Sequence, residues 1–118
     1  MKKIEAIIRK TKFDEVKTAL SEAGIEFFSF WEVRGVGQAR EGRMYRGVIY
    51  DTSSIERIKL SIIVRDKNVQ KTVNAVLSSA HTGETGDGKI FIMPIEESYR
   101  IRTGEKGDES LYIKGKEE

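Results

Sequence analysis

Residues 57–80 read RIKLSIIVRDKNVQKTVNAVLSSA, and this stretch contains two different apolar patterns. The first part, from Arg57 to Val64, alternates polar and apolar residues and then becomes continuously apolar, which predicts a strand. The second part follows Asp66 and has apolar residues three or four positions apart, which predicts an amphipathic helix. Those helical positions are Val69, Val73, Val76, Leu77 and Ala80. The stretch therefore predicts a strand followed directly by a helix.

The same order of patterns occurs near the N-terminus. Residues 2–9 read KKIEAIIR, with apolar residues at every second position and one more at Ile7, as in a strand that is covered on both faces. Residues 11–24 then predict an amphipathic helix, with Thr11 as its capping residue and Gly24 at its end. The chain therefore contains two predicted strand and helix pairs.

Two further strands and one long loop are predicted. Residues 28–36 are rich in aromatic and β-branched residues, and residues 89–93 form a short apolar run that Pro94 closes. Residues 38–56 are mostly charged or small and are longer than an ordinary connection, so we expect a functional loop that is mobile without ligand. Residues 99–102 predict a short extended piece.

The predicted order is strand, helix, strand, strand, helix, strand. This order is typical of an α+β, ferredoxin-like βαββαβ sandwich, in which an antiparallel sheet carries two helices on one face. A length of 118 residues fits a single domain. Because the strands carry apolar residues on both faces, we expect the uncovered face of the sheet to pack against other copies of the chain.

Composition excludes several classes of function. Lys and Arg total 21 against 19 Asp and Glu, without a long block of like charge, so no nucleic-acid partner is expected. The chain has no Cys and one His, which excludes disulfides, thiolate metal sites and histidine clusters. No apolar run approaches ~20 residues, and the start lacks a signal-peptide pattern. The sequence therefore predicts a cytoplasmic protein with no membrane insertion.

The richest chemical motif is residues 82–89, TGETGDGK. Glycines let backbone N–H groups converge on an anion, while Lys89 adds a positive charge and Thr82 a hydroxyl donor. The motif is not a Walker A loop, because Ile90 stands where that loop requires Ser or Thr. The residues alone leave two interpretations open, a phosphate cradle and an ordinary turn between a helix and a strand.

Two arginines form the second chemical signal. Arg100 and Arg102 alternate in the expected extended piece, so both face one side, where they can clamp a polyphosphate or lie on a solvated strand edge. His81 is interpreted as an ordinary loop residue. Spacing identifies no general base or activated nucleophile, which argues against a small nucleotide-hydrolysing enzyme. A permanently assembled subunit with a purely structural loop is a further interpretation.

Residues 82–91, TGETGDGKIF, resemble the C-terminal signature of the PII nitrogen-regulatory proteins. Residues 45–50, YRGVIY, are similar to the tyrosine motif in the loop of that family, and the start MKKIEAIIR and the later segments EVRG and RIRTGE follow in family order. The resemblance covers about residues 1–107. It implies a PII-like domain with its mobile loop at about 38–56, followed by a C-terminal tail at 108–118.

The resemblance also implies a function. It implies a homotrimer that is a regulator and not an enzyme, with sites for ATP or ADP in the clefts between subunits. The phosphates would be held by the glycine motif with the two arginines, and Ser29 would lie near the adenine. The residues implied in nucleotide binding are Ile7, Ser29, Gly35, Gly37, Gln38, Ile63, Gly86, Asp87, Gly88, Lys89, Arg100 and Arg102.

Further implied roles fall on residues where this chain departs from the family pattern. Gln38 is the candidate ligand of Mg and 2-oxoglutarate. Arg57 replaces the lysine that pairs with the 2-oxoglutarate carboxylate, and Ser61 replaces a glutamate. Tyr50 aligns with the tyrosine that the family modifies. The implied target is an ammonium transporter or an enzyme of nitrogen metabolism, and a PII-like protein that senses another ligand is the alternative.

Overall fold

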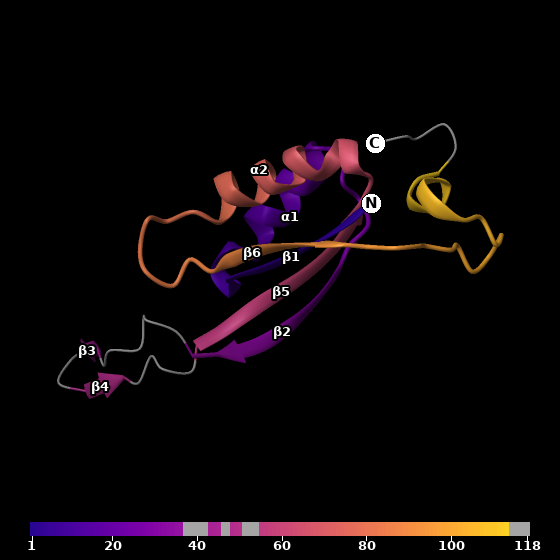
Figure 1. The fold of residues 1–118 in the computed structure, drawn as a ribbon. Helices are drawn as coiled ribbons and strands as arrows, with labels where there is room; N and C mark the ends of the chain where they lie inside the picture. The colour runs from indigo at the N-terminus through magenta and orange to yellow at the C-terminus, as the bar shows by residue number, and fades with distance from the viewer. Residues whose placement is uncertain (37–42, 46–47, 51–54, 114–118) are drawn as a thin grey trace.

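A four-stranded antiparallel sheet forms the centre of the molecule (Figure 1). The computed structural model describes residues 1–36, 43–45, 48–50 and 55–113. The strands are β1 (Lys2–Arg9), β2 (Ser29–Gly35), β5 (Ile55–Val64) and β6 (Lys89–Pro94), in the order β2-β5-β1-β6. Helices α1 (Phe13–Glu22) and α2 (Val69–Ala80) lie together over one face of the sheet (Figure 1). This arrangement confirms the predicted α+β sandwich of ferredoxin-like type.

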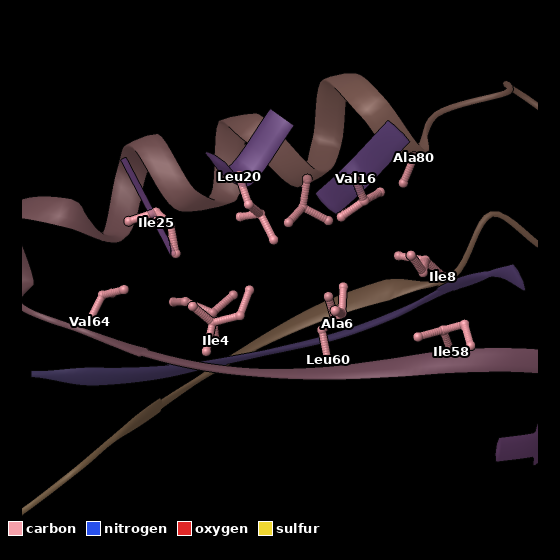
Figure 2. Close-up of a cluster of buried hydrophobic side chains, with 12 residues drawn as sticks. Ile4, Ala6, Ile8, Val16, Leu20, Ile25, Ile58, Leu60, Val64 and Ala80 are labelled. Atoms are coloured by element: carbon pink, nitrogen blue, oxygen red, sulfur yellow. The ribbon is translucent and has the colours of Figure 1, made fainter. Parts of the chain in front are cut away.

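The hydrophobic core lies between the sheet and the two helices. Strands β1 and β5 pair so that Ile4 lies opposite Ile62 and Ile8 opposite Ile58, and all four side chains are buried on the helical face. Figure 2 shows Val16 and Leu20 of α1 pointing from the helix layer toward these strands. The alternation of apolar residues in the sequence therefore predicts the buried face correctly.

The ends of several elements differ from the prediction, and β2 is one residue shorter at each end than the predicted strand at 28–36. Helix α1 begins at Phe13 after a short 3-10 helix (Lys10–Lys12), and its N-cap is Lys12 with no capping side chain, so the predicted capping by Thr11 is wrong. Asp14 and Glu15 lie in the first turn instead, where their negative charges interact favourably with the positive end of the helix dipole. Strand β5 begins at Ile55, before the predicted start of this strand.

A small hairpin lies within the predicted long loop. Strands β3 (Arg43–Tyr45) and β4 (Val48–Tyr50) pair antiparallel, with Met44 opposite Ile49. The sequence analysis predicted no strand here, although Val48, Ile49 and Tyr50 are residues that favour strands. The loop predicted to be mobile also includes residues 38–42, 46–47 and 51–54, which lie outside the described residues.

The C-terminal part is more compact than predicted. Residues 99–102 are not an extended piece, because Tyr99 makes a single bridge with Lys106 and residues 101–103 form a turn. A 3-10 helix, η3 (Gly107–Leu111), then spans the predicted boundary between domain and tail. Among the described residues, no helix has both the length and the apolar character that crossing a membrane would require.

Candidate functional site

The segment between α2 and β6 is organised around the carboxylate of Asp87. Its Oδ1 accepts a hydrogen bond from the Thr82 hydroxyl, and its Oδ2 accepts the backbone N–H groups of Thr82 and Gly83, each at 2.9 Å. These bonds, that of the Thr82 hydroxyl above all, hold the pKa of Asp87 well below its usual range. Asp87 is therefore an anion that holds residues 82–89, the glycine loop, in one shape.

Arg9, the last residue of β1, ties the glycine loop to the sheet. Its Nε donates to Asp87 Oδ1 at 3.1 Å, and its Nη2 donates to the Thr85 carbonyl at 3.0 Å. A guanidinium can make both contacts because its N–H groups form a rigid fork. The sequence analysis missed this residue because the two partners of the ion pair are 78 positions apart.

Gly88 marks the closest approach of the glycine loop to β1. Its φ is +101°, and a Cβ at this position would lie 1.7 Å from the carbonyl oxygen of Ile7. Only glycine fits such an approach. The next residue, Lys89, pairs directly with Ile7 in the sheet. The approach therefore places a cationic and an apolar side chain next to each other beside the glycine loop.

A cavity of about 320 Å³ lies against the glycine loop. Its lining includes Ile7, Asp87, Gly88 and Lys89, which are four of the predicted nucleotide-binding residues. Gly86, a fifth, adjoins them in the chain and has a φ of +104°. The structure thus brings the predicted phosphate residues of the glycine loop together with Ile7.

A second and larger groove, of about 680 Å³, contains another group of predicted residues. Ser29 at the start of β2, Ile63 on β5, and Arg100 and Arg102 all line it. Ser61, which replaces the usual glutamate, lines it as well and lies opposite Ser29 in the sheet. The groove therefore combines hydroxyl groups, an apolar side chain and two cations.

The guanidinium of Arg100 is engaged within its own chain. Its Nη1 forms an ion pair with Glu105, and its Nη2 donates to the carbonyls of Glu109, at 3.2 Å, and of Tyr112. The side chain of Arg100 is 21% exposed. The sequence pattern reveals neither Glu109 nor Tyr112 as a partner of Arg100, because both act through backbone carbonyls, which leave no signal in residue type.

The two groups of predicted residues lie apart. The glycine loop precedes β6, and the two arginines follow it, so the whole of β6 separates them along the chain. Six extended residues span about 20 Å at roughly 3.3 Å per residue. Figure 1 shows the glycine loop and the C-terminal segment at opposite ends of the sheet. One chain therefore does not bring both groups around a single ligand.

Gly35 and Arg57 lie at the same end of the sheet as the glycine loop. Gly35 ends β2, and Arg57 lies on β5 directly opposite Arg9. Burial, with the neighbouring charge of Arg9, lowers the pKa of Arg57. Within the part of the chain that the structure describes, the Arg57 guanidinium has no hydrogen-bond or ion-pair partner. This cation is therefore placed where an anion would relieve the repulsion from Arg9.

The remaining predicted residues are only partly covered. Gly37 and Gln38 lie outside the described residues, so the predicted Mg and 2-oxoglutarate contacts of Gln38 have no geometry here. Tyr50 ends β4. Among residues 1–36, 43–45, 48–50 and 55–113, no cluster of three or more His, Asp or Glu residues could hold a metal ion.

Comparison with known proteins identifies the family. The family model of "Nitrogen regulatory protein P-II" matches residues 1–105, which is most of the chain. This chain belongs to the P-II family. The family assignment confirms the resemblance that the glycine motif indicated, and it identifies a family of nitrogen regulatory proteins.

Curated relatives agree over almost the full length of this P-II chain. "Nitrogen regulatory protein P-II" of Azospirillum brasilense is 45% identical over 112 residues, which are 94% of this chain and 100% of that protein. The proteins of the same name from Microchaete diplosiphon and Synechocystis are 48% and 47% identical, with the same coverage. The family model ends at residue 105, whereas the alignments with these relatives cover 112 residues of this chain.

Proposed function

We propose that this chain is a P-II regulator that binds ATP or ADP in clefts between the subunits of a homotrimer. The observation that carries this proposal is the separation of the two groups of predicted residues, one at the glycine loop and one at the groove of Arg100 and Arg102. Because one chain keeps them apart, a ligand that uses both groups needs two copies. A cleft between neighbouring copies supplies one group from each.

The open face of the sheet supports association. On the face opposite the helices, Ile63 is 40% exposed and Phe91 is 45% exposed. Ile63 lies on β5 and Phe91 on β6, so both belong to the sheet and not to loops. Between them in the sheet, Glu5 forms ion pairs with Lys3 at 3.7 Å and Lys59 at 3.3 Å, which balance its charge. A face of apolar side chains with paired charges suits contact between copies.

The chemistry of the two groups suits a nucleotide. One copy contributes the backbone N–H groups of its glycine loop and the ammonium of Lys89, which bind the phosphates of the nucleotide. Arg102 and Arg100 of the neighbouring copy supply charge-assisted hydrogen bonds to the same phosphates. Ser29 and Ile63 supply a hydroxyl and an apolar wall for the adenine. Binding and orientation are thus the roles of these residues.

A second ligand is proposed for the end of the sheet where Arg57 lies. The half-buried guanidinium of Arg57 beside Arg9 suits a carboxylate, and Gln38 follows the nearby β2 in the sequence. We assign this position to 2-oxoglutarate, with Gln38 also a ligand of Mg that accompanies ATP. Bound Mg would neutralise phosphate charge and supply no chemical step.

The output of the regulator is the loop at residues 38–56. Nucleotide bound near Gly35, Gly37 and Gln38 changes the shape that this loop presents, so the energy state of the cell is converted into binding or release of a target. The target is an ammonium transporter or an enzyme of nitrogen metabolism. Modification of Tyr50 is a second control on the same loop. The chain itself acts as a regulator and not as an enzyme.

Two variants test the shared site. Lys89→Ala removes a phosphate contact from the glycine loop, and Arg102→Ala removes one from the groove. Each should weaken ATP binding by about tenfold or more in calorimetry, since a charge-assisted hydrogen bond is worth about 1.5–3 kcal/mol. Neither should change the mass of the trimer by light scattering, which we expect at three times 13.4 kDa.

Mixing the two variants decides whether the site is shared. In a mixed trimer, an Arg102→Ala chain still offers Lys89 and a neighbouring Lys89→Ala chain still offers Arg102, so some clefts are complete. Co-refolded variants should therefore regain tight sites that neither variant has alone. If mixing restores none, the site lies within one chain and the proposal is wrong. Titrations with ATP, ADP and AMP, each with and without 2-oxoglutarate, identify the ligands.

A further inference from the structure

The C-terminal segment at residues 105–113, here called the C-terminal clasp, encloses the guanidinium of Arg100. Glu105 supplies a carboxylate to Nη1, and the carbonyls of Glu109 and Tyr112 bind Nη2. The backbone N–H of Arg100 also donates a hydrogen bond to the backbone carbonyl of Glu105 at 2.8 Å. The clasp therefore satisfies this cation from three positions of its own chain.

The clasp also contacts the body of the protein through groups that do not bind Arg100. The Tyr112 ring lies under the Arg65 guanidinium, 4.3 Å from its centre. Near the start of the clasp, the Gly107 N–H donates to the Ser98 carbonyl at 2.8 Å, and the Ser110 hydroxyl donates to that of Ser98 at 2.7 Å. These contacts make the clasp a defined part of the fold.

The clasp also forms one wall of the 680 Å³ groove. Ser110, Leu111, Tyr112 and Ile113 line this groove together with Ser29, Ile63 and Arg102. The lining is therefore shared between predicted nucleotide residues and the clasp. A ligand that enters it meets both.

We propose that the C-terminal clasp competes with nucleotide phosphate for Arg100 and is released when phosphate binds. A guanidinium has five N–H donors in one plane, and those of Nη1 and Nη2 that bind Glu105, Glu109 and Tyr112 are not free for a phosphate. Glu105 is an anion in the position of a competing ligand. The proposal rests on the proposed function, and it makes the clasp the element that sets nucleotide affinity and reports occupancy.

The release follows from the charges involved. Phosphate oxygens carry more negative charge than one carboxylate and two carbonyls, and guanidinium pairs with phosphate are bidentate. Once Arg100 turns to phosphate, the Glu105 carboxylate and the carbonyls of Glu109 and Tyr112 lose their contacts with its guanidinium. The clasp then keeps only its contacts with Arg65 and Ser98. Nucleotide binding at the groove therefore loosens residues 106–113.

The test uses the full chain with a matched pair of variants. Glu105→Gln keeps the shape of the side chain but removes its charge from Arg100, so ATP should bind about three- to tenfold more tightly in calorimetry. Asp108→Asn removes the same charge from the clasp, but the Asp108 side chain has no hydrogen-bond or ion-pair partner within the described residues. This control should shift the affinity by less than about twofold.

Hydrogen exchange of the amides at residues 106–113 gives the second readout. Exchange in the wild-type chain should become faster at saturating ATP, and in Glu105→Gln it should already be faster without ATP. If ATP binds but exchange at 106–113 stays the same, or if Glu105→Gln binds ATP no more tightly than the wild type, the clasp proposal is wrong and the proposed function stands. If neither the wild type nor Glu105→Gln binds ATP, the proposed function itself fails, and the clasp proposal fails with it.

Discussion

Arg9 and Asp87 form an ion pair across 78 positions of sequence, with Nε 3.1 Å from Oδ1. Both side chains are about three-quarters buried, at 23% and 24% exposure, so solvent weakens the contact less than it would on an open surface. The same guanidinium also holds the Thr85 carbonyl. The shape of the glycine loop is therefore set by the end of β1 before any ligand arrives.

Arg9→Lys tests this role. The lysine keeps the charge but cannot bind Asp87 and the Thr85 carbonyl at once, so the glycine loop should hold phosphate less well. We expect ATP affinity to fall about five- to tenfold, with the fold intact by circular dichroism. Arg34→Lys is the matched control, because Arg34 pairs with Glu56 on an exposed part of β2 and should leave affinity unchanged. Equal effects of the two substitutions would show that Arg9 has no special part in the site.

Asp87 should make stability depend on pH in acid. Its folded pKa lies below its unfolded value, which is about 3.9, so its ionised form stabilises the fold above that value. This contribution is lost as pH falls from about 4 toward the folded pKa. Urea unfolding should therefore show a free-energy gap between wild type and Asp87→Asn that is constant from pH 7 to about 5 and narrows below about 4. If the difference in the free energy of unfolding between wild type and Asp87→Asn stays constant down to pH 3, the pKa of Asp87 is not lowered by folding and the prediction is wrong.

Gly88 is expected to tolerate no side chain. Gly88→Ala places a Cβ 1.7 Å from the Ile7 carbonyl oxygen in a positive-φ conformation, so β1 and the glycine loop must separate. We expect a loss of at least about 3 kcal/mol in the free energy of unfolding. Gly35→Ala is the control, since a Cβ there meets nothing within 4 Å, and it should cost less than about 1 kcal/mol. Thermal unfolding of both variants, compared with the wild type, measures these losses of stability, and a Gly88→Ala chain as stable as Gly35→Ala would contradict the prediction.

The sequence predicts the body of this fold well because its signals are local. Apolar alternation in β1 and β5 depends only on neighbouring residues, and it identifies the buried face that Ile4 and Ile62 share. The helical spacing after Asp66 likewise predicts α2. The exact bounds of elements such as α1, β2 and β5 differ, since tertiary packing and not spacing determines where an element begins and ends.

The candidate site is predicted in part, and the misses share one physical cause. The glycine motif points to the cradle and to Lys89, because glycine and lysine are visible as residue types. The roles of Arg9 and Glu105 were missed, because each acts through a partner that periodicity does not reveal. The turn at residues 101–103 was missed as well, since Arg100 and its bonds to the C-terminal clasp define it.

Phe91 tests the open face of the sheet as the trimer contact. Phe91→Lys places a cation opposite Glu5 on that face, where it is compatible with a single chain but unfavourable in an apolar contact between copies. Light scattering should show a smaller mass than the wild-type trimer. Leu77→Lys changes an apolar side chain on α2, on the other side of the molecule, that is 56% exposed against 45% for Phe91, and should keep the trimer mass. A trimer that survives Phe91→Lys would exclude this face as the contact.

The loop at residues 38–56 provides the last prediction. It contains Gly42 and Gly47 and few large apolar residues, and the hairpin of β3 and β4 pairs only three residues with three, which is too little to offset the conformational entropy that order would cost. Its amides should therefore exchange quickly in the free protein. Nucleotide that contacts Gly37 and Gln38 at the base of the loop restricts the chain there, so ATP or ADP should slow exchange across residues 38–56. Lys89→Ala, measured at the same nucleotide concentration, is the control, because it weakens phosphate binding at a site outside the loop and should restore fast exchange. Slow exchange in the free protein that neither nucleotide alters would show that the loop is a fixed part of the structure and that the proposed switch is wrong.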